Sequence, residues 1–186
     1  MFPTNPSDLH VVKFCRFVAR HQKPVHVVRE PMFGEAESDC FAIVEEQVAR
    51  LGGQRVIGWA IWELPGVFIE AEFHAVWRSP AGHLLDLTPH ALSPRGCTFL
   101  ADRNRSYDGR QVDNIRQPLV FDIDVFHFLI LQQRRFKVLN TGELADQHGQ
   151  VALSGELLAE YELIEQEQAR LEPVIFSRMQ RHRGPY

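Results

Sequence analysis

The sequence predicts an α+β fold, in which N-terminal helices pack on an antiparallel sheet and further helices follow at the C-terminal end. Helical spacing of apolar residues comes first along the chain, then aromatic and β-branched runs separated by turns, then long helical segments. The 186 residues, 45% of them hydrophobic, suffice for one buried core. We expect residues 1–121 to form that core and residues 122–186 to be a C-terminal helical extension of the same domain.

The N-terminal third predicts two helices. Ser7 or Asp8 can cap the first helix, Pro24 stops it, and its apolar stripe includes Cys15 as a small core residue. Gly52 or Gly53 supplies the left-handed residue that ends the second helix. The expected elements are a helix from Ser7 to Gln22, a short strand at Val25–Val28 and a helix from Ser38 to Leu51.

The middle of the chain predicts an antiparallel meander. Turn signals at Pro65-Gly66 and Ser79–Gly82 separate runs with high strand propensity, and the polar stretch Asp102–Gln117 is typical of a long surface loop. The expected strands are Arg55–Glu63, Val67–Trp77, Leu84–Thr88 and Cys97–Leu100.

The C-terminal third predicts helices rich in Glu and Leu. The expected elements are a helix from Asp122 or Asp124 to Asn140, a helix at Val151–Leu171, an interruption at Pro173 and a short helix to Gln180. These helices offer a surface through which the chain can form a homo-oligomer.

Composition excludes several classes of protein. A net charge of −4 gives no basic surface for a phosphate backbone, so we expect no nucleic-acid partner. The apolar runs are far shorter than the roughly 20 residues that cross a bilayer, and the N-terminus does not resemble a signal peptide. Three widely spaced cysteines indicate free thiols, and we expect a cytoplasmic location without cofactor or metal.

Cys40, His74 and Asp86 are the candidate catalytic residues. Cys40 falls at the start of the second helix, where unpaired backbone N–H groups favour a thiolate. His74 lies within a strand, and Asp86 lies in the next strand. A thiolate, an imidazole that pairs with it and a carboxylate that orients the imidazole make a nucleophile, base and orienter.

The hairpin between the two strands tests this hypothesis. A three-residue loop at Ser79–Ala81 puts His74 directly opposite Asp86, whereas a four-residue loop puts them on opposite faces. Gly82 suits the three-residue loop, because such loops often need a left-handed residue. The same three residues are also possible zinc ligands, but no Cys-x-x-Cys or His-x-x-x-His pair supports a metal site.

The order and context of these residues resemble the transglutaminase-like superfamily of papain-like cysteine enzymes. The resemblance covers roughly Glu37 to Pro89. It is carried by the helix start Asp39–Ala42, the turn into the next strand at Leu51–Trp59, the run Phe73–Trp77 around the histidine and the segment Gly82–Pro89 around the aspartate. It implies a papain-like fold, with Cys40 as nucleophile, His74 as general base and acid, and Asp86 as orienter. Asp39 departs from the Trp or Gly that often precedes the cysteine in that family.

The resemblance implies acyl transfer on an amide or ester, as in a peptidase, amidase, deamidase or transglutaminase acting on a protein or peptide. Trp59, Trp62 and Trp77 are candidates to line the cleft, and Glu70 and Glu72 are candidates to attract a cationic substrate. A catalytically inactive protein-binding module on the same fold is the first alternative. The second is an N-acyltransferase, because arylamine N-acetyltransferases share the Cys-His-Asp order, although their Arg-Gly-Gly approach to the cysteine is missing here.

Overall fold

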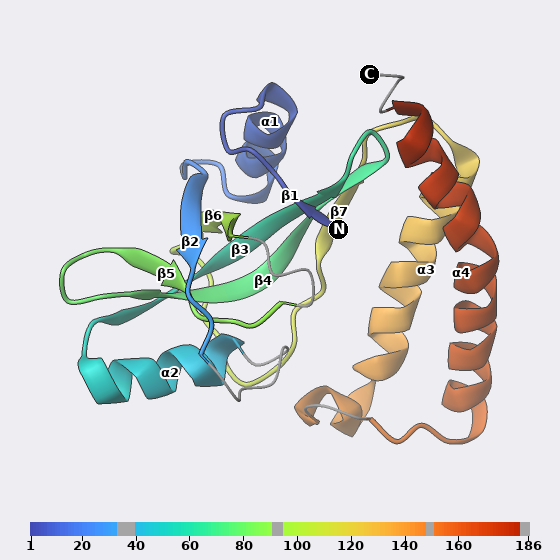
Figure 1. Ribbon diagram of the computed structural model, residues 1–186. Helices are drawn as coiled ribbons and strands as arrows, with labels where there is room; N and C mark the ends of the chain where they lie inside the picture. Colours follow the sequence, from blue (N-terminus) through green and yellow to red (C-terminus); the bar gives the residue numbers. More distant parts are fainter. Residues whose placement is uncertain (33–39, 91–94, 148–150, 183–186) are drawn as a thin grey trace. The chain divides into compact units, whose positions relative to one another are not determined.

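The computed structural model describes residues 1–32, 40–90, 95–147 and 151–182 (Figure 1). It confirms a mixed α and β protein with helices at both ends of the sequence. The elements in chain order are β1 (Phe2–Pro3), α1 (Leu9–Val18), β2 (Val25–Arg29), α2 (Cys40–Leu51), β3 (Gln54–Leu64), β4 (Phe68–Arg78), β5 (Leu84–Asp86), β6 (Gly96–Ala101), β7 (Ile115–Pro118), α3 (Ile123–Leu139), a 3-10 helix (Gly142–Asp146) and α4 (Gly155–His182).

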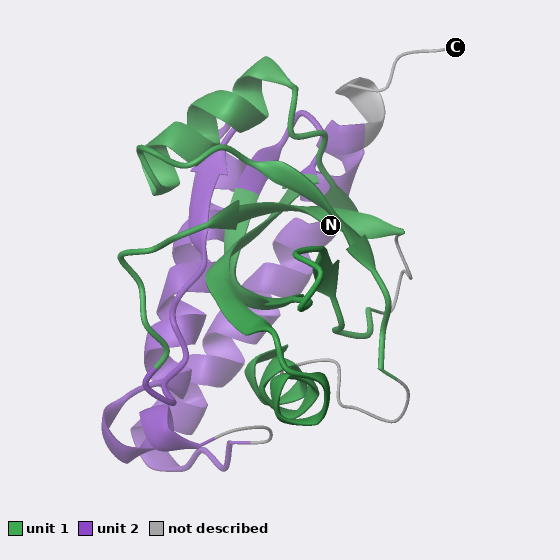
Figure 2. Ribbon diagram, turned by 90° about the vertical axis from the view of Figure 1, so that its left-hand side faces the viewer, with its two compact units in different colours: residues 1–63, 70–107 green, residues 64–69, 108–186 purple. Residues whose placement is uncertain are grey.

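Two compact units divide the chain (Figure 2). The first comprises residues 1–63 and 70–107, and the second comprises residues 64–69 and 108–186. The expected division of the domain at residue 121 stays a prediction.

The sheet of the structure forms a small barrel. Its strand order is β1-β3-β6-β2-β5-β4-β7, and β3 also pairs with β4, so the five inner strands close into a ring. The expectation of a purely antiparallel sheet is wrong, because β2 runs parallel to β5. A parallel pair needs a long crossover, and here the chain between the two strands contains α2, β3 and β4.

Side chains from four strands of this ring form one buried apolar cluster. Residues of one strand that face the interior are two positions apart, as Ala60 and Trp62 are, because side chains alternate along a strand. The cluster thus identifies the face of each strand that points into the barrel. Its members are Val27, Ala60, Trp62, Val76, Cys97 and Phe99.

Helix α2 lies along β4 on the outside of the barrel. Near its start, the rings of Phe41 and Phe73 are 5.2 Å apart between centroids. At its end, Trp77 Nε1 donates a hydrogen bond of 2.9 Å to the carbonyl of Gly52. Gly53 follows with φ +87°, and a Cβ there would lie 2.2 Å from the Arg78 carbonyl oxygen, so only glycine fits. These contacts at both ends fix the position of Cys40 at the helix start.

Helix α1 is shorter than the sequence predicts. It ends at Val18 rather than near Gln22, and it buries Val11, Phe14 and Cys15. Cys15 is fully buried, which confirms the prediction that it is a core residue. Phe17, another apolar residue of the same helix, is instead 73% exposed.

The second unit contains an antiparallel helix pair. The start of α3 meets the end of α4 through Arg178 and Asp122, whose Nε and Oδ2 atoms are 2.7 Å apart. Asp122 also accepts hydrogen bonds from the backbone N–H groups of Asp124 and Val125, which confirms it as the N-cap. No helix in the described part of the chain has the length and hydropathy that a membrane span requires.

Two expectations for this part of the chain need correction. The loop expected at Asp102–Gln117 ends earlier, because β7 begins at Ile115. Pro173 does not interrupt the last helix, because α4 runs from Gly155 to His182 through it. Leu171 and Ile175 on either side of Pro173 are both buried, and this packing offsets the backbone hydrogen bond that a proline removes.

Candidate active site

The β4–β5 hairpin puts His74 and Asp86 on the same face of the sheet. Its register pairs Trp77 with Leu85, and the ladder extends to a hydrogen bond of 2.9 Å from Ser79 N to His83 O. The loop therefore has three residues, Pro80–Gly82, one position later than expected. Asp86 then lies across from Val76 and diagonal to His74 rather than directly opposite it. The one-residue shift in the loop moves the pairing by two positions, which preserves the common face.

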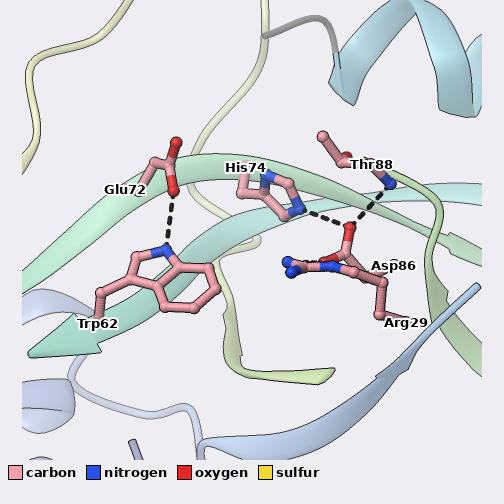
Figure 3. Close-up of polar contacts among 6 residues, drawn as sticks. All are labelled: Arg29, Trp62, Glu72, His74, Asp86 and Thr88. Atoms are coloured by element: carbon pink, nitrogen blue, oxygen red, sulfur yellow. Dashed lines mark hydrogen bonds and ion pairs between the residues drawn. The ribbon is translucent and has the colours of Figure 1, made fainter. Parts of the chain in front are cut away.

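The imidazole of His74 and the carboxylate of Asp86 contact each other directly in the barrel interior. His74 Nε2 and Asp86 Oδ1 are 3.0 Å apart (Figure 3). Asp86 is fully buried and His74 is 5% exposed. Asp86 Oδ1 also accepts a hydrogen bond of 3.1 Å from the backbone N–H of Thr88, so this oxygen is fixed from two sides.

Cys40 completes the arrangement from the first residue of α2. Its side chain lies near the His74 imidazole and interacts with it electrostatically, which favours the charged form of the ring. Because Nε2 is held by Asp86, Nδ1 is the ring nitrogen that remains for the sulfur. Three residues that are far apart in sequence are thus brought together as the sequence predicts. Ser38 and Asp39, where the helix is expected to begin, lie outside the described residues.

The electrostatics of the site favour a charged imidazole. Burial by itself would lower the pKa of His74, but Cys40 and Asp86 outweigh it and raise that pKa well above its ordinary value. Burial would likewise raise the pKa of Asp86, but His74 and Arg29 hold it well below its usual range. The arrangement therefore stabilises an imidazolium between two groups that carry negative charge when ionised.

Arg29, at the end of β2, is the member of the site that sequence reasoning missed. Its Nε and Nη2 lie 2.9 Å and 2.5 Å from Asp86 Oδ2 (Figure 3). The guanidinium also lies over the ring of Trp62, 5.6 Å from its centroid. The expected strand stopped at Val28, one residue short. Alternation from buried Val27 was the available signal, since it assigns Arg29 to the inward face.

Trp62 of β3 and Glu72 of β4 contact each other near the His74–Asp86 pair (Figure 3). Trp62 Nε1 donates a hydrogen bond of 2.8 Å to Glu72 Oε2, as Figure 3 shows. The Trp62 ring also stacks on His90, with centroids 4.9 Å apart. Glu72, one of the candidate substrate residues, therefore lies on the face that carries His74 and keeps an exposed position.

Of the other candidate substrate residues, Trp59 and Trp77 lie on the outer side of the barrel, and Glu70 lies farther along β4. Trp77 is on the opposite face of β4 from His74, and Trp59 contacts Phe73 on that same outer side. Trp59 is 1% exposed, and its Nε1 donates a hydrogen bond of 3.0 Å to Asp102. Glu70 shares the His74 face by alternation and is half-buried.

The remaining two cysteines are buried and lack the features of Cys40. Burial raises the pKa of Cys15 to about 12. The pKa of Cys97 is also raised, first by burial and then by the negative charge of nearby Asp86. Among the described residues, Cys40 is the cysteine that interacts with the His74 imidazole.

Comparisons with known proteins do not assign this chain to a family. No family model matches the sequence, and neither the characterised proteins nor the solved structures include a significant match. The interpretation of the site therefore depends on its own residues.

Proposed function

We propose that this protein is a cysteine enzyme that transfers an acyl group from an amide or ester, with Cys40 as nucleophile, His74 as base and acid, and Asp86 as orienter. The observation that carries the proposal is the clustering of the three residues: His74 Nε2 lies 3.0 Å from Asp86 Oδ1, and Cys40 is close enough to His74 to raise the pKa of the imidazole. A nucleophile within hydrogen-bonding reach of a base, itself held by a third group, is the arrangement that such chemistry needs.

The proposed reaction has two stages. The Cys40 thiolate attacks the substrate carbonyl and forms a C–S bond, and the His74 imidazolium gives its proton to the departing amine or alcohol. The resulting thioester is attacked by water or an amine, and His74 removes the proton of that attacking group. The Cys40–substrate bond then breaks, and the thiolate is regenerated.

Two features of the site support this role. The first four backbone N–H groups of a helix have no partner within the helix, so the start of α2 offers donors where negative charge develops on the substrate oxygen. Asp86, held on both oxygens, fixes the ring orientation of His74. The resemblance to transglutaminase-like enzymes supports a papain-like assignment of the fold and a protein or peptide substrate.

One observation favours a non-catalytic binding module instead. Cys40 is 6% exposed, and a nucleophile must be reached by its substrate. The same buried chain of polar groups would then serve only to hold the barrel together. All three cysteines are free thiols, which fits the proposed cytoplasmic location in either case.

Site-resolved alkylation separates the two functions. Iodoacetamide labelling of each cysteine is measured by mass spectrometry from about pH 5 to 9 in wild type, His74→Ala and His83→Ala. His83 is an exposed histidine of the β4–β5 hairpin and serves as the matched control. The proposal expects fast labelling of Cys40 at about pH 6, slowed by His74→Ala only. Labelling of Cys40 at the rate of a simple thiol, or none, supports the binding module.

Activity is then assayed on a glutamine-containing peptide and a peptide anilide, with and without a primary amine. Cys40→Ser controls for chemistry unrelated to the thiol. Ammonia or aniline release that needs both Cys40 and His74 supports the enzyme, and incorporation of the amine distinguishes transfer from hydrolysis. Reactive Cys40 without turnover of any amide or ester contradicts the proposed chemistry.

A further inference from the structure

We propose that Arg29 is a positioning residue of this site, which holds Asp86 in orientation and neutralises its charge so that the His74 imidazolium remains available to the Cys40 thiolate. This inference rests on the proposed function. It assigns a task to a residue that neither touches the thiol nor belongs to the Cys-His-Asp set.

The backbone aligns Arg29 with Asp86 directly. In the parallel ladder between β2 and β5, Arg29 and Asp86 are register partners. Two donors of the guanidinium bind the same oxygen, Oδ2, at 2.9 Å and 2.5 Å. Oδ1 is thereby left to His74 Nε2 at 3.0 Å. Arg29 thus decides which oxygen faces the imidazole, and a fork with two contacts fixes that choice more firmly than one contact does.

The charges along the chain of contacts alternate. In the ion-pair form that the proposed function requires, Arg29 and the His74 imidazolium are positive, and Asp86 and the Cys40 thiolate are negative. With Arg29 the four groups sum to zero, whereas without it one negative charge is in excess in a buried site. Coulomb interactions are strong there because the effective dielectric constant is low. The excess charge would oppose formation of the Cys40 thiolate.

The surroundings of Arg29 leave Asp86 as its main polar partner. Its side chain is 4% exposed, and its Nη1 atom is buried without a hydrogen-bond partner among the described residues. A buried guanidinium that leaves one donor unpaired is costly, so its contacts with Asp86 and the Trp62 ring must offset that cost. The titratable groups around the network are Glu72 and His74 of β4, Asp86 of β5, Cys97 of β6 and Cys40 of α2.

The test is the pH profile of Cys40 alkylation in wild type, Arg29→Met, Arg29→Lys and a control, Arg78→Met. Arg78 is an exposed arginine at the end of β4. The inference expects Arg29→Met to slow labelling at about pH 6 by about tenfold or more and to move the profile up by about one pH unit. Arg29→Lys restores the charge without the fork and should recover part of that loss. Arg78→Met should match wild type.

The outcomes distinguish this inference from the proposed function. If Cys40 of wild type labels no faster than a simple thiol, the proposed function fails. If wild type labels fast and Arg29→Met keeps the same profile, only the role of Arg29 is overturned. Labelling of buried Cys15 reports loss of the fold. If Arg29→Met unfolds, the test uses Arg29→Gln, which keeps a hydrogen-bond donor for Asp86 but removes the charge. An unchanged pH profile of Cys40 labelling in Arg29→Gln overturns the inference, and an upward shift of that profile supports it.

Discussion

Replacing Asp86 by asparagine should cost much of the stability of the protein, and the cost should depend on Arg29. The asparagine side chain would keep one oxygen, which can still accept from the backbone N–H of Thr88 and from His74. Its amide nitrogen would instead face the two donors of Arg29 that now bind Oδ2 at 2.9 Å and 2.5 Å. Both sides would then donate, and a buried guanidinium would lose its counter-charge.

The structure sets the size of this loss. Two hydrogen bonds to charged groups contribute about 1.5–3 kcal/mol each, and breaking a buried ion pair from one side costs about 3–5 kcal/mol. With Asp86 fully buried and the Arg29 side chain 4% exposed, we expect Asp86→Asn to lower the free energy of unfolding by about 3–5 kcal/mol. Total stability is commonly about 5–15 kcal/mol, so the variant should remain folded but fragile.

Urea unfolding followed by tryptophan fluorescence measures this loss. With a slope of about 1–3 kcal/mol per molar urea, the midpoint should fall by at least about 1 M. Arg29→Met combined with Asp86→Asn should be more stable than Asp86→Asn alone, because the uncompensated charge is gone. A loss below about 1 kcal/mol, or a double variant whose losses simply add, would refute the coupling described here.

Two further predictions concern pH and the glycine positions. The pKa of His74 is raised in the folded state. The stabilising contribution of His74 is therefore complete below about pH 6.5 and is lost as the pH rises through the folded pKa. In urea unfolding at several pH values, His74→Gln should flatten this decline in the free energy of unfolding, and an unchanged dependence on pH would contradict the prediction. Gly53→Ala should lower the melting temperature far more than Gly82→Ala. Both have positive φ, but a Cβ at Gly53 meets the Arg78 carbonyl oxygen at 2.2 Å while Gly82 has open space, so equal losses would argue against the close approach.

Local sequence signals predicted the parts of the site that are themselves local. The helix that starts at Cys40 follows from its apolar spacing and the glycines after it. The common face of His74 and Asp86 follows from alternation and a three-residue loop. The loop was displaced by one residue because several turn residues stand side by side at Ser79–Gly82, and local propensity does not choose between neighbouring positions.

Long-range pairing was beyond the reach of the same reasoning. Arg29 and Asp86 are 57 positions apart, and nothing in either segment indicates that β2 runs parallel to β5. The tryptophans show a related limit. Trp59 and Trp62 belong to one strand, and only the closed barrel determines that Trp62 faces the site while Trp59 faces outward. The inward face depends on which strands meet, and that is a property of the whole chain.

The parallel pairing of β2 with β5 also has a consequence for folding. Helix α2 and the β3–β4 hairpin can form from neighbouring residues, whereas the Arg29–Asp86 pair requires closure of a long loop, which is entropically costly and slow. Until the barrel closes, Asp86 lacks the contacts with Arg29 that hold its carboxylate. The reactivity proposed for Cys40 would therefore appear during refolding when β2 pairs with β5, rather than when helix α2 forms.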